Sequence, residues 1–255
     1  MTNADILDIA MRQSAVDSNC LAEDFTAREN KIVLSKQNPG ARQYLELPFL
    51  CDLTSYGSNI VASVSPEFED ITREYIGKYP VEHCFETPSI HALTDKLLPL
   101  GASVCFMAEY FLPDIGALKA LDCPYQLRLL QPEDLSPFYL PRWKNALSME
   151  RRELDMLAYG AFDGGDLIGL AGCSADCGSM WQIGIDVLEG HRGRGVASCL
   201  TSRLALELLG REIAPFYCCA WSNLGSVRNA IKSGFRPAWV QLTVKKIDFI
   251  EKMNR

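Results

Sequence analysis

The second half of the chain shows the apolar–polar alternation and the short apolar runs that are typical of strands. Such patterns occupy residues 125–130, 180–188, 216–221 and 237–246. Residues 157–175 have the pattern of two strands joined at Asp163-Gly164-Gly165-Asp166, and this tetrapeptide is a strong hairpin signal.

Three segments between these strands have helical patterns. Residues 131–147 open with Pro132 and two acids, a good helix start. A second helix begins near Val196, presents an apolar residue at each following turn and ends at Gly210. A third covers residues 223–235 and is stopped by Gly234. The order β-α-β-β-β-α-β-α-β predicts an α/β fold, with a mixed sheet and helices on both faces.

The first half also predicts an α/β domain, smaller than the second. Residues 58–65 are expected to be a buried strand, and residues 65–79 a helix with Ser65 as N-cap and Pro66 in its first turn. A second helix is expected over residues 87–100. Residues 102–112 fit a strand or a buried helix, because their periodicity does not decide between the two. We therefore expect two domains, residues 1–123 and 124–255.

Charge is divided unevenly between these two parts. The chain of 255 residues has a net charge of −7, but residues 1–123 hold 9 Lys/Arg and 18 Asp/Glu, whereas residues 124–255 hold 16 and 14. This distribution argues against a general nucleic-acid binder, which would need a basic face, and no nucleic-acid partner is expected. The acids of the first part are either a solvated surface or, for some of them, part of a site that attracts cations.

Composition also indicates where the protein works. The N-terminus is acidic and lacks the apolar core of a signal peptide, and the most apolar stretch, residues 97–111, is interrupted by Pro99, Gly101 and Glu109. We therefore expect a cytoplasmic protein that does not enter a membrane. Its 10 cysteines include no Cys-x-x-Cys pair, which favours reduced thiols. Cys173, Cys177, Cys218 and Cys219 match no common zinc spacing, so no metal is expected.

The sequence Arg192-Gly193-Arg194-Gly195 lies between an expected strand and an expected helix. A helix N-terminus has unpaired N–H groups and the positive end of the helix dipole, and glycines let a ligand approach the backbone. The alternative to a diphosphate-binding loop is a tight turn with solvated arginines. A nucleotide P-loop is excluded because no Gly-Lys-Ser/Thr follows, and a dinucleotide-binding loop because Ser198 replaces the third glycine.

Arg192-x-x-Gly195-x-Ala197 resembles the Arg/Gln-x-x-Gly-x-Gly/Ala signature of the GNAT acyltransferase superfamily. Residues 223–235 resemble that family's next helix, with Asn223 ahead of Gly234-Phe235, and residues 125–135 resemble its first strand and helix. The resemblance covers residues 124–255. The whole chain resembles two-part bacterial GNAT proteins that are functionally uncharacterised.

This resemblance implies that acetyl-CoA is the cosubstrate and that its acetyl group passes directly to an amine. In the family the loop holds the pyrophosphate, and the pantetheine arm pairs with a splayed strand that corresponds to Ile185, Asp186 and Val187. The implied cosubstrate site comprises Ile185, Asp186, Val187, Arg192, Gly193, Arg194, Gly195, Val196, Ala197, Ser198, Asn223 and Ser226. The acidic first part leads us to expect a small cationic amine as acceptor, with residues 1–123 supplying part of its pocket.

The catalytic groups are less well indicated. Asp186, in a buried strand, is a candidate general base, and Glu109 is a second if the first part covers the acceptor site; each can equally be a hydrogen-bonded structural carboxylate. Many relatives carry a tyrosine as general acid where this chain has Ala230. Ser226, Asn223 and Tyr217 are the candidates to stabilise the leaving thiolate instead. His191 could act as a base by its chemistry, but its place on the phosphate side favours a contact with phosphate or solvent. Trp221 is either a wall of the acceptor site or a core residue.

The missing tyrosine keeps other functions open. One is a module that binds coenzyme A without catalysis and acts as a sensor or scaffold. Another is an acetyltransferase that acts on a protein N-terminus or a lysine side chain. The sequence does not identify the acceptor or the acyl chain length, and it leaves the oligomeric state open.

Overall fold

The computed structural model describes all residues, Met1–Arg255, and the chain forms two compact units. The first unit consists of Met1–Ala10 and Phe111–Pro237, and the second of Met11–Tyr110 and Ala238–Arg255. Helix α1 (Asn3–Ser18) and strands β4 (Ala102–Pro113) and β10 (Phe235–Lys246) contribute residues to both units. The division therefore does not follow a single cut between residues 123 and 124, because β10 returns the chain to the sheet of the second unit.

The first unit contains a mixed sheet with the strand order β9-β8-β7-β6-β5. These strands are β5 (Gln126–Leu130), β6 (Asp155–Asp163), β7 (Asp166–Ser174), β8 (Met180–Val187) and β9 (Ala214–Cys219). Neighbours from β5 to β8 are antiparallel, and β9 runs parallel to β8. The predicted hairpin is confirmed: Gly164 (φ 57°) and Gly165 (φ 102°) both adopt the left-handed conformation that a two-residue turn requires.

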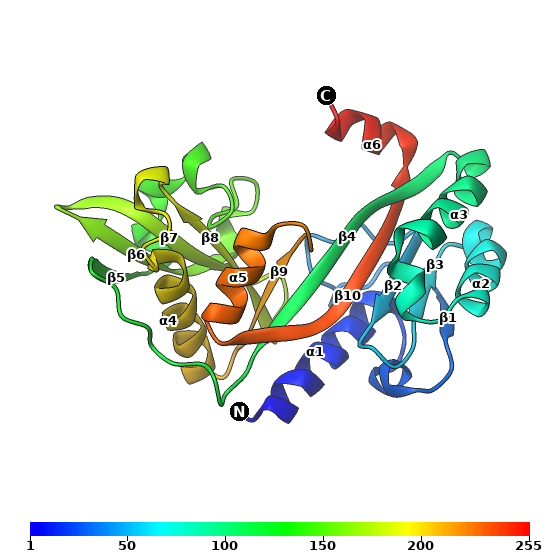
Figure 1. Ribbon diagram of the computed structural model, residues 1–255, viewed down its shortest axis with the longest axis horizontal. Coiled ribbons are helices and arrows are strands. Elements are labelled where there is room, and N and C mark those ends of the chain that lie inside the picture. The colour runs from blue at the N-terminus through cyan, green and yellow to red at the C-terminus, as the bar shows by residue number, and fades with distance from the viewer. The chain divides into compact units, whose positions relative to one another are not determined.

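Helices α4 (Val196–Gly210) and α5 (Leu224–Lys232) pack on one face of this sheet, beside each other (Figure 1). The predicted apolar face of α4 is confirmed, because Val196, Leu200, Leu204 and Leu208 are all buried in the largest core cluster of the unit. Each fully buried leucine contributes about 2 kcal/mol to folding, so this face fixes the position of the loop that precedes α4.

The helix expected over residues 131–147 is wrong. This segment forms three short 3-10 turns, Pro132–Asp134, Ser136–Phe138 and Pro141–Trp143. Each turn contains a proline, which lacks an N–H donor and clashes with the preceding turn of an α-helix. The segment nevertheless covers the face of the sheet opposite α4, where Leu135, Trp143 and Leu147 pack on Ala158 and Leu170. An irregular segment thus replaces the helix expected on that face.

The second unit has the strand order β1-β3-β2-β10-β4. Strand β1 (Lys31–Leu34) is parallel to β3 (Val61–Val64), and β2 (Cys51–Ser55) is antiparallel to both β3 and β10. Helices α2 (Glu69–Lys78) and α3 (Thr87–Leu97) cover one face, and the second half of α1 contacts the other. Residues 102–112 are a strand, which decides the alternative left open by their periodicity. A short helix, α6 (Ile247–Met253), follows β10.

Ionisable groups are buried inside the second unit. Asp17 and Arg42 form an ion pair at 2.5 Å, and both side chains are 3% exposed. Asp52 accepts hydrogen bonds from Gln241, at 3.0 Å to each carboxylate oxygen, and from the Thr243 hydroxyl. Burial raises the pKa of Asp52 to about 6, although these hydrogen bonds oppose the shift.

Candidate functional site

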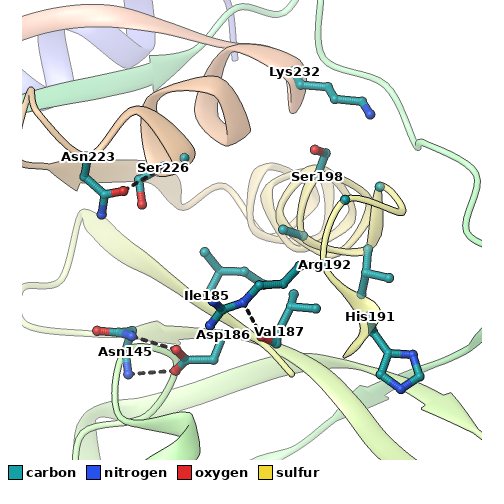
Figure 2. Close-up of a pocket in the computed structure, with 15 residues that line it drawn as sticks. Asn145, Ile185, Asp186, Val187, His191, Arg192, Ser198, Asn223, Ser226 and Lys232 are labelled. Carbon is teal, nitrogen blue, oxygen red and sulfur yellow. Dashed lines mark hydrogen bonds between the residues drawn. The ribbon is translucent and has the colours of Figure 1, made fainter. Parts of the chain in front are cut away.

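A cavity of about 500 Å³ opens in the first unit at the N-terminus of α4. It is lined by the end of β8, by the loop and first turn of α4, and by α5 with the residue that precedes it (Figure 2). Eleven of the twelve residues expected to contact a cosubstrate line this cavity: Ile185, Asp186, Val187, Arg192, Gly193, Gly195, Val196, Ala197, Ser198, Asn223 and Ser226. The cavity also includes Asn145, His191, Gly225 and Lys232.

Backbone donors are available where the loop meets the cavity. Gly193 (φ 75°) and Gly195 (φ 81°) are both left-handed, a conformation that other residues adopt at a cost. The first helical hydrogen bond of α4 runs from Cys199 N to Gly195 O at 3.0 Å. The N–H groups of residues 196–198 therefore have no partner within the helix, as at any helix N-terminus, and they face an anion-binding position.

The cations around this cavity form no ion pair within the chain, although the Asp186 carboxylate also lines the cavity. Arg192 and Lys232 line it, and the Lys232 Nζ lies 3.8 Å from where a Cβ on Gly195 would be. None of the ion pairs in the structure includes Arg192, Arg194 or Lys232. Together with the helix dipole, this arrangement fits a multiply charged anion such as a diphosphate.

The basic side chains of the loop have different roles. Arg192 donates from Nε to the carbonyl of Val187 at 3.0 Å, which ties the loop to the end of β8. Arg194 points elsewhere and donates to the Tyr125 hydroxyl at 2.9 Å, so it is the one expected cosubstrate contact that does not line the cavity. The same hydroxyl lies 3.2 Å from Nδ1 of His191, which does line it.

Strands β8 and β9 separate beside the cavity. They are paired only from Met180 with Ala214 to Gln182 with Phe216. Beyond Gln182, the edge of β8 that faces β9 has no strand partner, and Ile185 and Val187 on this part of β8 line the cavity. Free backbone N–H and C=O groups on such an edge can pair with an extended, amide-containing ligand.

The start of α5 forms the other side of the cavity. Asn223 caps this helix by accepting a hydrogen bond from Ser226 N at 3.2 Å (Figure 2). Behind Ser226 lies Tyr217, whose buried hydroxyl interacts with Ser226 and Asn229, and burial raises the pKa of this phenol. Ala230 is fully buried.

The two candidate bases differ in their surroundings. Asp186 accepts hydrogen bonds from Asn145 N, Asn145 Nδ2 and Ala146 N, at 2.8, 2.6 and 3.1 Å. Glu109 belongs to β4 in the second unit, and burial raises its pKa above the usual value. Its catalytic role stays a prediction. Trp221 is 62% exposed, so the alternative that it packs in the core is wrong.

A second cavity of about 310 Å³ lies in the same unit. Its walls are residues 144–151 on one side and Gly172, Ser174, Gln182 and Gly184 of the sheet on the other. Asn145 lines both cavities. Asp155, at the edge of the second cavity, accepts a hydrogen bond from Ser148 N at 2.9 Å, and burial raises its pKa to about 6.

No three His, Cys, Asp or Glu side chains are grouped so as to hold a metal ion. None of the helices has the length and apolar character needed to cross a bilayer.

The division into units changes the charge balance on which one expectation rested. The first unit holds 13 Lys/Arg and 16 Asp/Glu, and the second holds 12 and 16. The two units are thus about equally acidic. Some acidic residues before residue 124 belong to the first unit, and basic residues near the C-terminus belong to the second. The uneven charge distribution therefore no longer supports the expected preference for a cationic acceptor.

Comparison with known proteins finds similarity at the level of solved structures. No family model matches the chain, and no curated protein matches it. A GNAT-family protein from Novosphingobium aromaticivorans is 21% identical with a TM-score of 0.43, over 56% of this chain and 66% of that one. A GCN5-related N-acetyltransferase-like protein from Streptococcus suis is 18% identical with a TM-score of 0.47, over 62% and 68%. A GNAT-family acetyltransferase from Colwellia psychrerythraea is 15% identical with a TM-score of 0.45, over 72% and 76%.

Apart from the helix expected over residues 131–147, the elements of residues 124–246 follow one another in the expected order. Antiparallel strands β5 to β8 lead to a parallel neighbour, β9, from which β8 separates, and a glycine loop follows β8 and opens α4. In this strand order and in its loop, the chain resembles the GNAT N-acetyltransferases.

Proposed function

We propose that the chain is an N-acetyltransferase that uses acetyl-CoA and acetylates the amine of a small acceptor. The observation that carries this proposal is the cavity at the N-terminus of α4. There, cations that form no ion pair and backbone N–H groups without a helical partner adjoin a free strand edge. A diphosphate attached to an amide-containing arm needs both of these features next to each other, and coenzyme A has that composition.

The residues present fit this cosubstrate. The backbone of residues 193–198, with Arg192 and Lys232, would hold the diphosphate, and the free edge of β8 at Ile185 and Val187 would pair with the pantetheine amides. When bound, acetyl-CoA supplies an acyl group activated as a thioester. The chain contributes hydroxyl donors at the start of α5, where Ser226 lines the cavity and the Tyr217 phenol lies behind it.

The second cavity is the proposed site of the acceptor. This cavity lies on the face of β8 that carries Gln182 and Gly184, and it shares Asn145 with the first. Its volume of about 310 Å³ suits a small molecule. It contains both acids and bases, Asp155 and Asp176 as well as Lys144 and Arg151, so an acceptor that carries polar groups besides its amine fits better than an apolar one.

A second candidate function is a coenzyme A-binding module without turnover. The specific observation in its favour is the fully buried Ala230 at the position where many GNAT enzymes have a tyrosine acid. Loss of that acid need not prevent transfer, because a thiol of pKa about 8.5 leaves well as a thiolate.

The test combines binding and turnover on the full chain. Acetyl-CoA is titrated calorimetrically, and the protein is then incubated with acetyl-CoA and a panel of amines, amino acids and lysine peptides. Because the chain has ten free cysteines, which consume thiol reagents, the acetylated product is detected by mass spectrometry. Binding with acetylation of a small amine supports the proposal. Binding with no product on any acceptor favours the module, and modification of peptides alone favours a protein acetyltransferase.

A further inference from the structure

We infer that Asp186 is a positioning residue: it fixes residues 143–147 between the two cavities and so sets the affinity for the amine acceptor, without accepting the amine's proton. The inference rests on the proposed function as far as the acceptor is concerned. The attachment of the segment can be tested independently of it.

The contacts of Asp186 all go to this one segment. Oδ2 accepts from the backbone N–H of Asn145 at 2.8 Å and of Ala146 at 3.1 Å, and Oδ1 accepts from Asn145 Nδ2 at 2.6 Å. Figure 2 shows the carboxylate turned toward Asn145. Hydrogen bonds to a charged acceptor are the stronger kind, and two consecutive backbone donors on one oxygen fix both the position and the direction of the segment.

Two glycines let the same segment lie directly on the sheet. Gly172 and Gly184 are cross-strand partners in β7 and β8. A Cβ on Gly184 would lie 1.7 Å from the carbonyl oxygen of Asn145, and one on Gly172 would lie 2.1 Å from that of Ala146. Real Cβ atoms do not approach oxygen so closely, so only glycine permits this contact. The segment is therefore held by the hydrogen bonds to Asp186 and by the packing of Trp143 and Leu147 against the sheet.

The position of the segment matters because it separates two cavities. Asn145 lines both of them, and the residues that follow it form one wall of the second cavity. Along β8, Gly184 and Asp186 point to the face of this segment, whereas Ile185 and Val187 point to the opposite face. A shift of residues 143–147 would change the wall of the second cavity and, through Asn145, one edge of the first, whereas the loop and the first turn of α4 do not belong to the segment.

The same contacts argue against a role for Asp186 as general base. A base must accept a proton from the substrate, and a proton on this carboxylate would weaken the hydrogen bonds that it accepts from Asn145 and Ala146. Proton transfer to Asp186 would thus loosen the segment at the moment when the acceptor must be held in place.

The experiment compares the wild type with Asp186→Asn and, as a second perturbation of the same contact, Gly184→Ala. Gly178→Ala is the matched control, since a Cβ there meets open space and the residue lines neither cavity. Three quantities are measured: amide hydrogen exchange of residues 143–147, the dissociation constant of acetyl-CoA, and the pH dependence of turnover with separate KM values for the amine and acetyl-CoA.

For Asp186→Asn we expect amide exchange in residues 143–147 to become at least tenfold faster and the KM for the amine to rise about tenfold. The affinity for acetyl-CoA should stay within about threefold of the wild type, and the acidic limb of the pH–rate profile should keep its midpoint. Gly184→Ala should increase the same exchange, and Gly178→Ala should not. Loss of the acidic limb with a fall in kcat of about 10²–10⁴ would make Asp186 the base and overturn the inference. Unchanged exchange in Asp186→Asn would overturn it as well, even if the wild type acetylates no amine; in that case the proposed function fails separately.

Discussion

Replacement of Gly195 by glutamate is the sharpest perturbation of the proposed diphosphate site. Gly195 has φ 81° and directly precedes α4, and a Cβ on it would extend toward the Lys232 ammonium 3.8 Å away. No backbone atom lies in its path, so the fold should accept the side chain. The carboxylate, however, would occupy the space between the loop and Lys232, where the diphosphate is proposed to bind.

The magnitude follows from two contributions. A left-handed conformation costs an L-residue about 1–2 kcal/mol of stability. Displacing the diphosphate from two backbone donors, at about 1.5–3 kcal/mol for each hydrogen bond to a charged group, costs 3 kcal/mol or more in binding, which is roughly a hundredfold or greater loss of affinity. The two costs can be measured separately, because another left-handed glycine of the chain lies outside the cavity and its replacement would carry the stability cost alone.

The matched control is Gly101→Glu. Gly101 has φ 67°, a Cβ there meets nothing within 4 Å, and the residue belongs to the second unit. Both variants should unfold at temperatures a few degrees below the wild type. Calorimetric titration with acetyl-CoA should show wild-type affinity for Gly101→Glu and at least a hundredfold weaker binding for Gly195→Glu. Wild-type affinity in Gly195→Glu would refute the assignment of the loop.

Two other predictions concern charge. Lys232→Met should weaken acetyl-CoA binding about three- to fivefold at physiological salt and less at about 1 M salt, because the ammonium is exposed and its charge is screened. Lys252→Met is the control, and equal effects of the two substitutions would show that Lys232 does not belong to the site. Asp52 has a pKa of about 6 in the folded protein, above its usual 3.8, so the folded state keeps the proton at pH values where the unfolded state has lost it. The wild type is therefore most stable at acidic pH, and its free energy of unfolding falls as pH rises from 3.8 to about 6. Asp52→Asn should therefore gain about 3 kcal/mol relative to the wild type between pH 3.5 and 7.5 in urea unfolding, and an unchanged difference would contradict the argument.

Local patterns in the sequence predicted the parts of the fold that local interactions determine. The hairpin at Gly164-Gly165, the buried face of α4 and the loop before it follow from turn chemistry and from apolar spacing over a few residues. The resemblance to GNAT proteins predicted most of the cavity lining, because it assigned positions in this loop, in the strand before it and at the start of α5.

The remainder depends on contacts between distant parts of the chain. Helix α1 was not predicted because its buried positions include Gln13, Ser14 and Asp17, and a polar buried face shows no apolar stripe. The division into units was not predicted because β10 pairs with β2, nearly two hundred residues earlier. Lys232 and Asn145 reach the cavity from the end of α5 and from an irregular segment, and neither position carries a recognisable motif.

Amide hydrogen exchange with and without acetyl-CoA is the decisive measurement for the proposal that the loop and the first turn of α4 hold the diphosphate. We predict that acetyl-CoA slows exchange in residues 193–198, whose N–H groups would become donors to phosphate, and along the free edge of β8 at residues 183–187. Protection confined to other parts of the chain, or no protection at about 1 mM acetyl-CoA, would contradict it.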